Sequence, residues 1–146
     1  MPDSTTTLFD VNALVALCLT SHQHHHAAHR FLAGLTGRWA TCPTTEHALV
    51  RLLLNPAVTG RVRPSAEVLA VLAGVRTDPR WIFLPDDTSL ASPLVQTGVL
   101  MGYQQVTDLA LVNLAARHTA RLASFDAALT TWLAPADRTH VELIPA

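Results

Sequence analysis

The sequence predicts an α/β fold built on a mainly parallel five-stranded sheet. Short runs rich in β-branched and aromatic residues alternate with longer apolar runs of helical period, a pattern typical of right-handed βαβ units. The chain has 146 residues, of which 49% are hydrophobic and 14% charged, and this length can enclose one core. No linker, repeat or low-complexity tract divides it. We therefore expect a single domain over residues 1–146, with helices on both faces of the sheet.

The first 42 residues predict two strands and two helices. Residues 5–9 combine threonines with two large apolar residues, which favours a strand. The polar, histidine-rich segment 21–26 lies between two helical runs and is typical of a connection. The expected elements are strands at 5–9 and 38–42 and helices at 12–18 and 27–35.

Residues 43–84 predict two more helices and a third strand. Pro43 begins the turn into the first of these helices, and Asn55-Pro56 ends it because a residue before proline disfavours helical geometry. Ser65 is expected to cap the second helix. The expected elements are helices at 45–54 and 65–76, a loop at 61–64 and a strand at 81–84.

The remainder of the chain predicts three helices and two strands. Pro93 fits the first of these helices only within its first turn. Thr107 is expected to cap the next helix, in which apolar residues recur with helical period. The expected elements are helices at 89–101, 108–118 and 127–133 and strands at 121–125 and 141–144.

Four carboxylates occupy the ends of these elements. Asp10 directly follows the first strand and Asp126 the fourth, while Glu46 and Asp108 lie in the first turns of helices. The carboxyl ends of parallel strands and the helix starts that follow them share one edge of an α/β sheet. Each acid alone has an ordinary explanation in turn formation or in the helix dipole. Together they predict one acidic pocket.

Carboxylates collected in one pocket repel one another and must bind cations or take up protons. An all-oxygen ligand set with room for water suits Mg²⁺, or Mn²⁺, better than zinc. Two such ions can activate a water molecule and stabilise the leaving oxygen of a phosphodiester. The acids therefore predict metal-dependent hydrolysis of a phosphodiester.

The segments around the four acids resemble the acidic motifs of PIN-domain nucleases and occur in the order of that family. These segments are Phe9-Asp10-Val11-Asn12, Cys42-Pro43-Thr44-Thr45-Glu46, Val106-Thr107-Asp108 and Ser124-Phe125-Asp126. Flanking segments such as Leu84-Pro85-Asp86-Asp87 are similar to those of VapC toxins. The resemblance covers residues 8–133, nearly the whole chain.

This resemblance implies a PIN-like α/β/α sandwich with a Mg²⁺ pocket. It also implies an endoribonuclease that cleaves structured RNA such as tRNA or rRNA, forms a homodimer and is inhibited by a VapB antitoxin. The implied site residues are the catalytic metal ligands Asp10, Asp108, Glu46 and Asp126, with Asn12 and Ser124 in support as residues that orient ligands or water.

Other polar residues are functional candidates that also have ordinary structural explanations. Arg51, Arg61 and Arg63 are candidates for RNA contact, although a surface arginine is the ordinary alternative. Two residues of a histidine cluster share helical spacing, but no acid or cysteine nearby completes a zinc site, and we expect capping and packing roles. The cluster consists of His22, His24, His25, His26 and His29.

The composition excludes several other functions. All ten basic residues are arginines, whereas receiver domains, haloacid-dehalogenase-like phosphatases and Walker-type NTPases need a lysine near the phosphate. A net charge of −1 argues against a strongly basic wrapper of nucleic acid. Two unpaired cysteines, a start unlike a signal peptide and short apolar runs predict a cytoplasmic protein with no membrane partner. The alternatives left are a catalytically silent RNA- or protein-binding PIN-like module and a DNA-directed metallonuclease.

Overall fold

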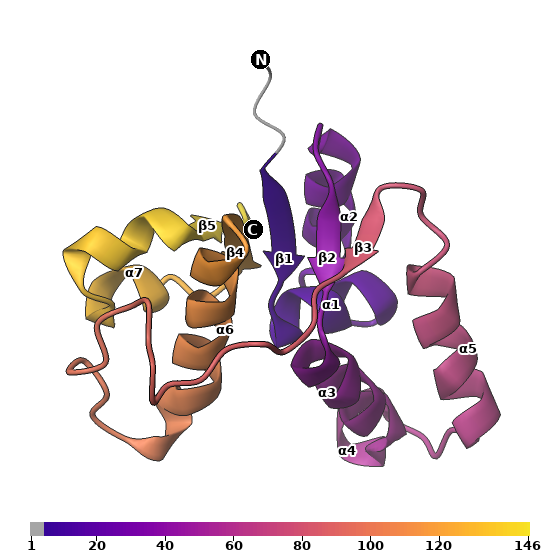
Figure 1. The fold of residues 1–146 in the computed structure, drawn as a ribbon. Helices are drawn as coiled ribbons and strands as arrows, with labels where there is room; N and C mark the ends of the chain where they lie inside the picture. Colours follow the sequence, from indigo (N-terminus) through magenta and orange to yellow (C-terminus); the bar gives the residue numbers. More distant parts are fainter. Residues whose placement is uncertain (1–4) are drawn as a thin grey trace.

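The computed structural model, which describes residues 5–146, contains the predicted five-stranded sheet (Figure 1). The strands lie in the order β3-β2-β1-β4-β5, and every neighbouring pair is parallel. Their bounds are β1 Thr6–Phe9, β2 Trp39–Thr41, β3 Trp81–Phe83, β4 Ala120–Ser124 and β5 Val141–Leu143.

Helices cover both faces of the sheet, as predicted for an α/β/α sandwich. Successive strand residues point to opposite faces, so Phe9 packs with Leu49 in one core while Leu8 packs with Leu109 in the other. The first core is covered by α1 Val11–Cys18, α2 His25–Gly34, α3 Pro43–Leu54 and α5 Ser65–Val75. The second is covered by α6 Val106–Arg117 and α7 Leu129–Trp132. Within residues 5–146, no helix is long and apolar enough to cross a membrane.

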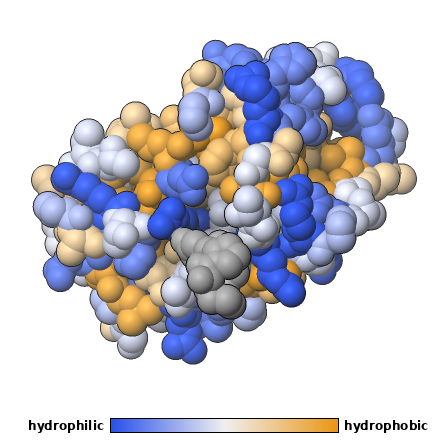
Figure 2. Space-filling view, turned by 90° about the horizontal axis from the view of Figure 1, so that it is seen from above, coloured by the Kyte–Doolittle hydropathy of each residue, from blue (hydrophilic) through white to orange (hydrophobic). Residues whose placement is uncertain are grey.

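The order of the strands opens a crevice at one edge of the sheet. From β1 the chain continues to β2 and β3 on one side, whereas β4 and β5 lie on the other side. Connections that diverge in this way leave room beyond the carboxyl ends of the two central strands, β1 and β4. These ends lie at the lower edge of the sheet in Figure 1. Figure 2 shows the opposite end, where hydrophilic residues and smaller hydrophobic areas are interspersed.

Residues 89–101 are not helical, so this prediction was wrong. The backbone N–H of Leu94 donates to Asn113 Oδ1 and that of Gln96 to Asp137 Oδ2, both at 2.8 Å. Val95, between them, is 5% exposed and belongs to the core beneath α6. In a helix, the N–H groups of Leu94 and Gln96 would instead donate to the carbonyls four residues earlier. Pro93 has no N–H, so such a helix would also lack one hydrogen bond. Tertiary contacts therefore decide the conformation of this connection.

Several boundaries also differ from the prediction. The sixth helix begins at Val106 after Gln105, so Thr107 is not its cap, and Pro64 rather than Ser65 precedes α5. The second helix begins two residues earlier than expected, at His25. The short elements α4 Pro56–Thr59, η1 Tyr103–Gln105 and η2 Pro135–His140 were not predicted.

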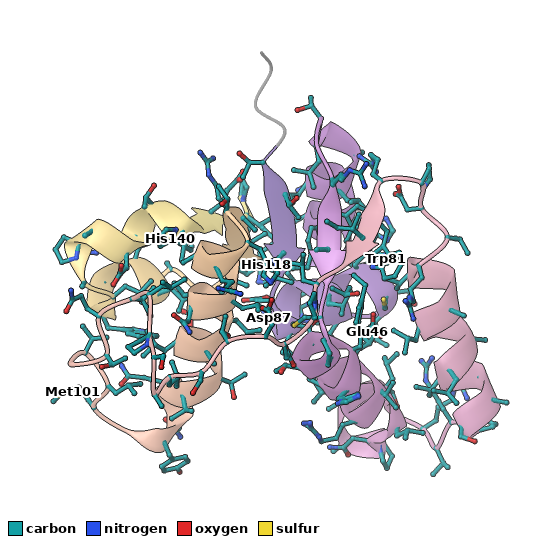
Figure 3. The ribbon with its side chains drawn as sticks, in the orientation of Figure 1. Glu46, Trp81, Asp87, Met101, His118 and His140 are labelled. Atoms are coloured by element: carbon teal, nitrogen blue, oxygen red, sulfur yellow. The ribbon has the colours of Figure 1, made fainter. Side chains whose placement is uncertain are left out.

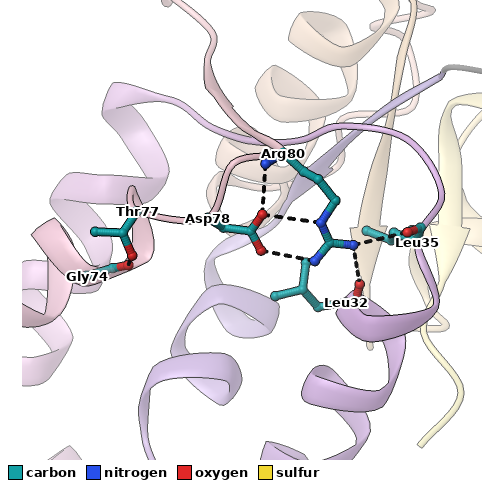
Figure 4. Close-up of polar contacts among 6 residues, drawn as sticks. All are labelled: Leu32, Leu35, Gly74, Thr77, Asp78 and Arg80. Atoms are coloured by element: carbon teal, nitrogen blue, oxygen red, sulfur yellow. Dashed lines mark hydrogen bonds and ion pairs between the residues drawn. The ribbon is translucent and has the colours of Figure 1, made fainter.

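Arg80 braces the turn before β3 against the end of α2 (Figure 4). Its guanidinium donates to the carbonyls of Leu32 and Leu35, both at 3.0 Å. It also pairs with Asp78 through Nε at 3.2 Å and Nη2 at 3.0 Å, and this contact holds the pKa of Asp78 below its usual range. Carbonyls at the end of a helix have few partners within it. The arginine supplies a donor to Leu35 and a second donor to Leu32, whose carbonyl also accepts the Leu35 N–H.

Candidate active site

Asp10 lies where β1 passes into α1. Its side chain caps α1 by accepting a hydrogen bond from the Ala13 N–H at 2.7 Å. Its own N–H donates to the carbonyl of Ala123 on β4 at 3.0 Å, which fixes it at the junction of the two central strands. The residue is only 5% exposed. The carboxylate therefore has a definite position at the predicted edge of the sheet.

Asp108 and Asp126 meet Asp10 around one cavity. Asp108 lies in the first turn of α6, and Asp126 follows β4, where its Oδ1 accepts a hydrogen bond from Ala128 N–H at 2.9 Å. The cavity has a volume of about 570 Å³, and all three aspartates line it. Three of the four predicted acids, from distant parts of the sequence, are thus brought together.

Burial and neighbouring negative charges raise the pKa of two of these acids, Asp10 and Asp108. Burial raises the pKa of Asp10 to about 6, and the charges of Asp108 and Asp126 add to the rise, while hydrogen bonds from Ser124 and Ala13 partly offset it. Burial and the charge of Asp126 also raise the pKa of Asp108. A protein without a compensating cation therefore holds these carboxylates at a cost.

Glu46, unlike the three aspartates, is not among the residues that line the cavity. It is 7% exposed. Its Oε2 accepts a hydrogen bond from the Thr41 hydroxyl at 2.6 Å, and the hydroxyl oxygen accepts one from the indole N–H of Trp81 at 2.9 Å. Figure 3 shows Glu46 on α3 and Trp81 on β3. The place of Glu46 in the catalytic set remains a prediction.

The two supporting residues are near the acids. Asn12, on the first turn of α1, lines the cavity. Ser124 is fully buried at the end of β4, where its Oγ accepts a hydrogen bond from the Asp126 N–H at 3.0 Å. Ser124 thus links the conformations of the two strand-end aspartates.

Comparison with known proteins identifies the family. No protein-family profile matches the chain. The chain is 43% identical over 138 residues to ribonuclease VapC38 of Mycobacterium tuberculosis, which covers 94% of this chain and 96% of the relative. Ribonucleases VapC39 and VapC29 of the same organism are 38% and 36% identical, and each alignment covers 85% of this chain and 91% or 88% of the relative. The chain belongs to the VapC ribonuclease family.

Membership of the VapC family makes the protein a PIN-domain nuclease, a hydrolase, and the toxin component of a toxin–antitoxin system. VapC enzymes depend on a metal ion. Within residues 5–146, no three histidine, cysteine or acidic side chains lie close enough together to hold a metal ion as they stand. The chemistry of the three aspartates nevertheless fits a divalent cation, because carboxylate oxygens are its preferred ligands, and a cation would offset the burial and mutual repulsion that raise the pKa values of Asp10 and Asp108.

The three arginines proposed for RNA contact do not line the cavity of this VapC protein. Arg61 and Arg63 both pair with Glu67 on α5, at 2.6 Å and 3.6 Å. Arg51 is exposed on α3. Their contact with RNA therefore remains a prediction, and two of them have a structural partner.

Four of the five clustered histidines fall into two groups, and the fifth, His26, is exposed. His25 and His29 bond the carbonyls of Ala16 and Leu17 at 2.8 and 2.9 Å and so attach α2 to α1, the packing role expected for them. His22 and His24 instead line the acidic cavity of the VapC fold, together with Phe125. Sequence reasoning missed this placement because it depends on the path of the loop between α1 and α2, which no periodicity signals.

Proposed function

We propose that this VapC protein is a Mg²⁺-dependent endoribonuclease, with Mn²⁺ as an alternative ion, whose catalytic residues are Asp10, Asp108 and Asp126. The observation that carries the proposal is the single cavity that these three carboxylates line at the carboxyl edge of the sheet. The raised pKa of Asp10, caused chiefly by burial, supports a site built to receive positive charge. Glu46 and Ser124 are proposed to complete and orient the set.

The residues divide the chemical work. Asp10 and Asp108 would hold the divalent cation, which when bound would make water a nucleophile at neutral pH and offset the charge of the phosphate. The capping bond from Ala13 keeps Asp10 in place. Ser124 orients Asp126 through its backbone N–H. Structured tRNA or rRNA as the substrate, and a homodimer in solution, remain predictions.

We propose a VapB-like antitoxin as the partner. An arginine inserted into the acid-lined cavity would pair with two carboxylates and exclude the cation. A small protein encoded beside the gene, with an arginine in its tail, is the expected partner. Adding it should block RNA cleavage, and its Arg→Ala variant should not.

The test of the enzyme is cleavage of total bacterial RNA with and without Mg²⁺. Asp10→Asn and Asp108→Asn should reduce cleavage by at least about 100-fold, because each removes a carboxylate that would hold the cation acting on the reacting phosphate. Glu142→Gln, which changes a half-buried acid on β5 outside the cavity, is the matched control and should cut like the parent.

The same assay separates the alternatives. A catalytically silent binding module would retain RNA without cutting it, and a DNA-directed metallonuclease would cut duplex or flap DNA in preference to RNA. If folded Asp10→Asn and Asp108→Asn proteins cut RNA at the parent rate, the site assignment is wrong.

A further inference from the structure

Polar residues other than the aspartates also line the acidic cavity. Asn12 lies on the first turn of α1, and His22 and His24 belong to the loop between α1 and α2. Among the described residues that line the cavity there is no arginine, and the sequence has no lysine. The side-chain hydrogen-bond donors among these lining residues are therefore the amide of Asn12 and the imidazoles of His22 and His24.

The hydrogen bonds of His22 determine its tautomer. The backbone N–H of His24 donates to Nδ1 of His22 at 3.0 Å, so Nδ1 carries no proton. In a neutral imidazole the proton must then lie on Nε2, which is 3.1 Å from Oδ1 of Asn12. Burial, with the neighbouring His24 and His25, lowers the pKa of His22 and so favours the neutral ring. His22 is thus a donor to Asn12.

This hydrogen bond orients the amide of Asn12. Its oxygen faces His22, so its NH₂ group is the other end of the amide and makes no hydrogen bond to a described residue. Asn12 is exposed and lies two residues after Asp10, on the first turn of α1. The amide nitrogen is therefore a free donor beside the acids.

A stacked pair of rings holds the loop in this place. The imidazole of His24 lies against the ring of Phe125, with centroids 4.5 Å apart and planes 16° from parallel. Phe125 directly precedes Asp126, so the stack attaches the loop to the strand end that carries a catalytic acid. The His24 backbone that fixes His22 is thereby positioned relative to the cavity.

We propose that His22 is a positioning residue that turns the NH₂ group of Asn12 toward the cavity, where this group binds a phosphate oxygen of the RNA. The inference rests on the proposed ribonuclease function and adds to it a substrate-binding donor. The Asn12 amide would supply a hydrogen-bond donor to the RNA backbone next to the carboxylates, in a cavity whose described lining residues include no arginine. Binding by a neutral donor also avoids a cation that would compete with the metal ion for the acids.

Two substitutions of His22 separate this role from simple support of the loop. His22→Gln places an amide near the position of Nε2 and can still donate to Asn12, but it cannot accept the His24 N–H. His22→Asn places an oxygen near Nδ1 and keeps the loop bond, but it cannot reach Asn12. A positioning role predicts that Gln preserves function and Asn does not, whereas a structural role predicts the reverse.

The assay uses an RNA oligonucleotide that spans the cleavage position mapped for the parent chain in total bacterial RNA. His22→Asn and Asn12→Ala should raise KM about tenfold or more with kcat changed by less than about threefold, because a hydrogen bond to a charged phosphate is lost. His22→Gln should stay within about threefold of the parent KM. His26→Asn, on an exposed histidine outside the cavity, is the control and should leave both constants unchanged.

A spectroscopic measurement tests the hydrogen bonds without turnover. The imidazole ¹⁵N shifts of His22 should report the proton on Nε2 in the parent and in Asp108→Asn. A proton on Nδ1, or a parent-like KM for His22→Asn with a raised KM for His22→Gln, would overturn the inference and leave the proposed function standing. If the parent chain cuts no RNA, the proposed function falls and this inference with it.

Discussion

Asp10 is both the N-cap of α1 and a carboxylate buried in a cavity that two other acids line. Its capping role needs only an acceptor oxygen, whereas its raised pKa shows that the negative charge itself is unfavourable where it lies. Since an Asn oxygen would serve the cap equally well, the charge is retained for a function other than folding. A stability cost at a functional residue is a common compromise.

The first prediction concerns Asp10→Asn in EDTA. Because the pKa of Asp10 is raised from 3.8 to about 6, the native state binds more protons than the unfolded state between these values, and its stability falls as pH rises through about 6. Asn removes the titration, so the variant should be more stable than the parent above about pH 6, by on the order of 1–3 kcal/mol. Urea unfolding at several pH values measures this. A variant less stable than the parent at pH 7.5 would contradict it.

Thr41 joins Glu46 to Trp81, and the second prediction concerns its hydroxyl. Thr41→Val has nearly the same shape but leaves the buried Glu46 carboxylate without its donor and the Trp81 indole without its acceptor. We expect a loss of about 2–4 kcal/mol in the free energy of unfolding. Thr41→Ser keeps the hydroxyl and should lose less than about 1.5 kcal/mol. Equal stability of the Val variant and the parent would show that the two hydrogen bonds contribute nothing.

Which site residues can be predicted depends on how each is positioned. Asp10 and Asp126 directly follow predicted strands, and Asp108 lies in a predicted first turn, so topology alone brings them to one edge. His22 and His24 occupy a loop whose path is determined by contacts with Asn12 and Phe125, residues distant in sequence. Their place in the cavity could not be read from spacing.

At the scale of elements, the sequence predicts strands and long helices better than connections. All five strands are found within one residue of the expected bounds, and the apolar runs of the central strands β1, β2 and β4 are largely buried. Residues 89–101 have the apolar content of a helix, yet Asn113 and Asp137 bind their backbone N–H groups. Local propensity is a weak guide where side chains from other elements satisfy the backbone.

The third prediction concerns the brace between α2 and β3. Arg80→Ala removes two donors from carbonyls near the end of α2 and leaves Asp78 unpaired. The ion pair is partly exposed and contributes little, so we expect a loss of about 1–2 kcal/mol, mainly from the carbonyls. Arg80→Lys cannot reproduce the forked geometry and should recover less than half of the loss. Arg38→Ala, an exposed arginine just before β2, is the control for charge. If thermal unfolding shows that Arg80→Ala is no less stable than Arg38→Ala, the contacts of Arg80 do not stabilise the fold.

At the scale of the whole molecule, the carboxylates couple the two halves of the sheet. Asp10 belongs to the β1–α1 unit, whereas Asp108 and Asp126 flank β4 on the other side of the crevice. A cation shared by these acids would bind the native state and not the unfolded chain, in which they are far apart in sequence. Binding should therefore stabilise the entire fold rather than one loop.

The last prediction follows from this coupling. Mg²⁺ at a hundred times its Kd should raise the free energy of unfolding by about 2.7 kcal/mol, and EDTA should reverse the effect. Any salt would also stabilise the fold, because it screens the repulsion between the acids. The effect of Mg²⁺ is therefore compared with that of NaCl at equal ionic strength. Asp10→Asn and Asp108→Asn should be more stable in EDTA but respond weakly to Mg²⁺, whereas Glu142→Gln should respond like the parent. If all four proteins gain equally from Mg²⁺ and from NaCl, the acids do not share a cation, and the stability that they forfeit needs another explanation.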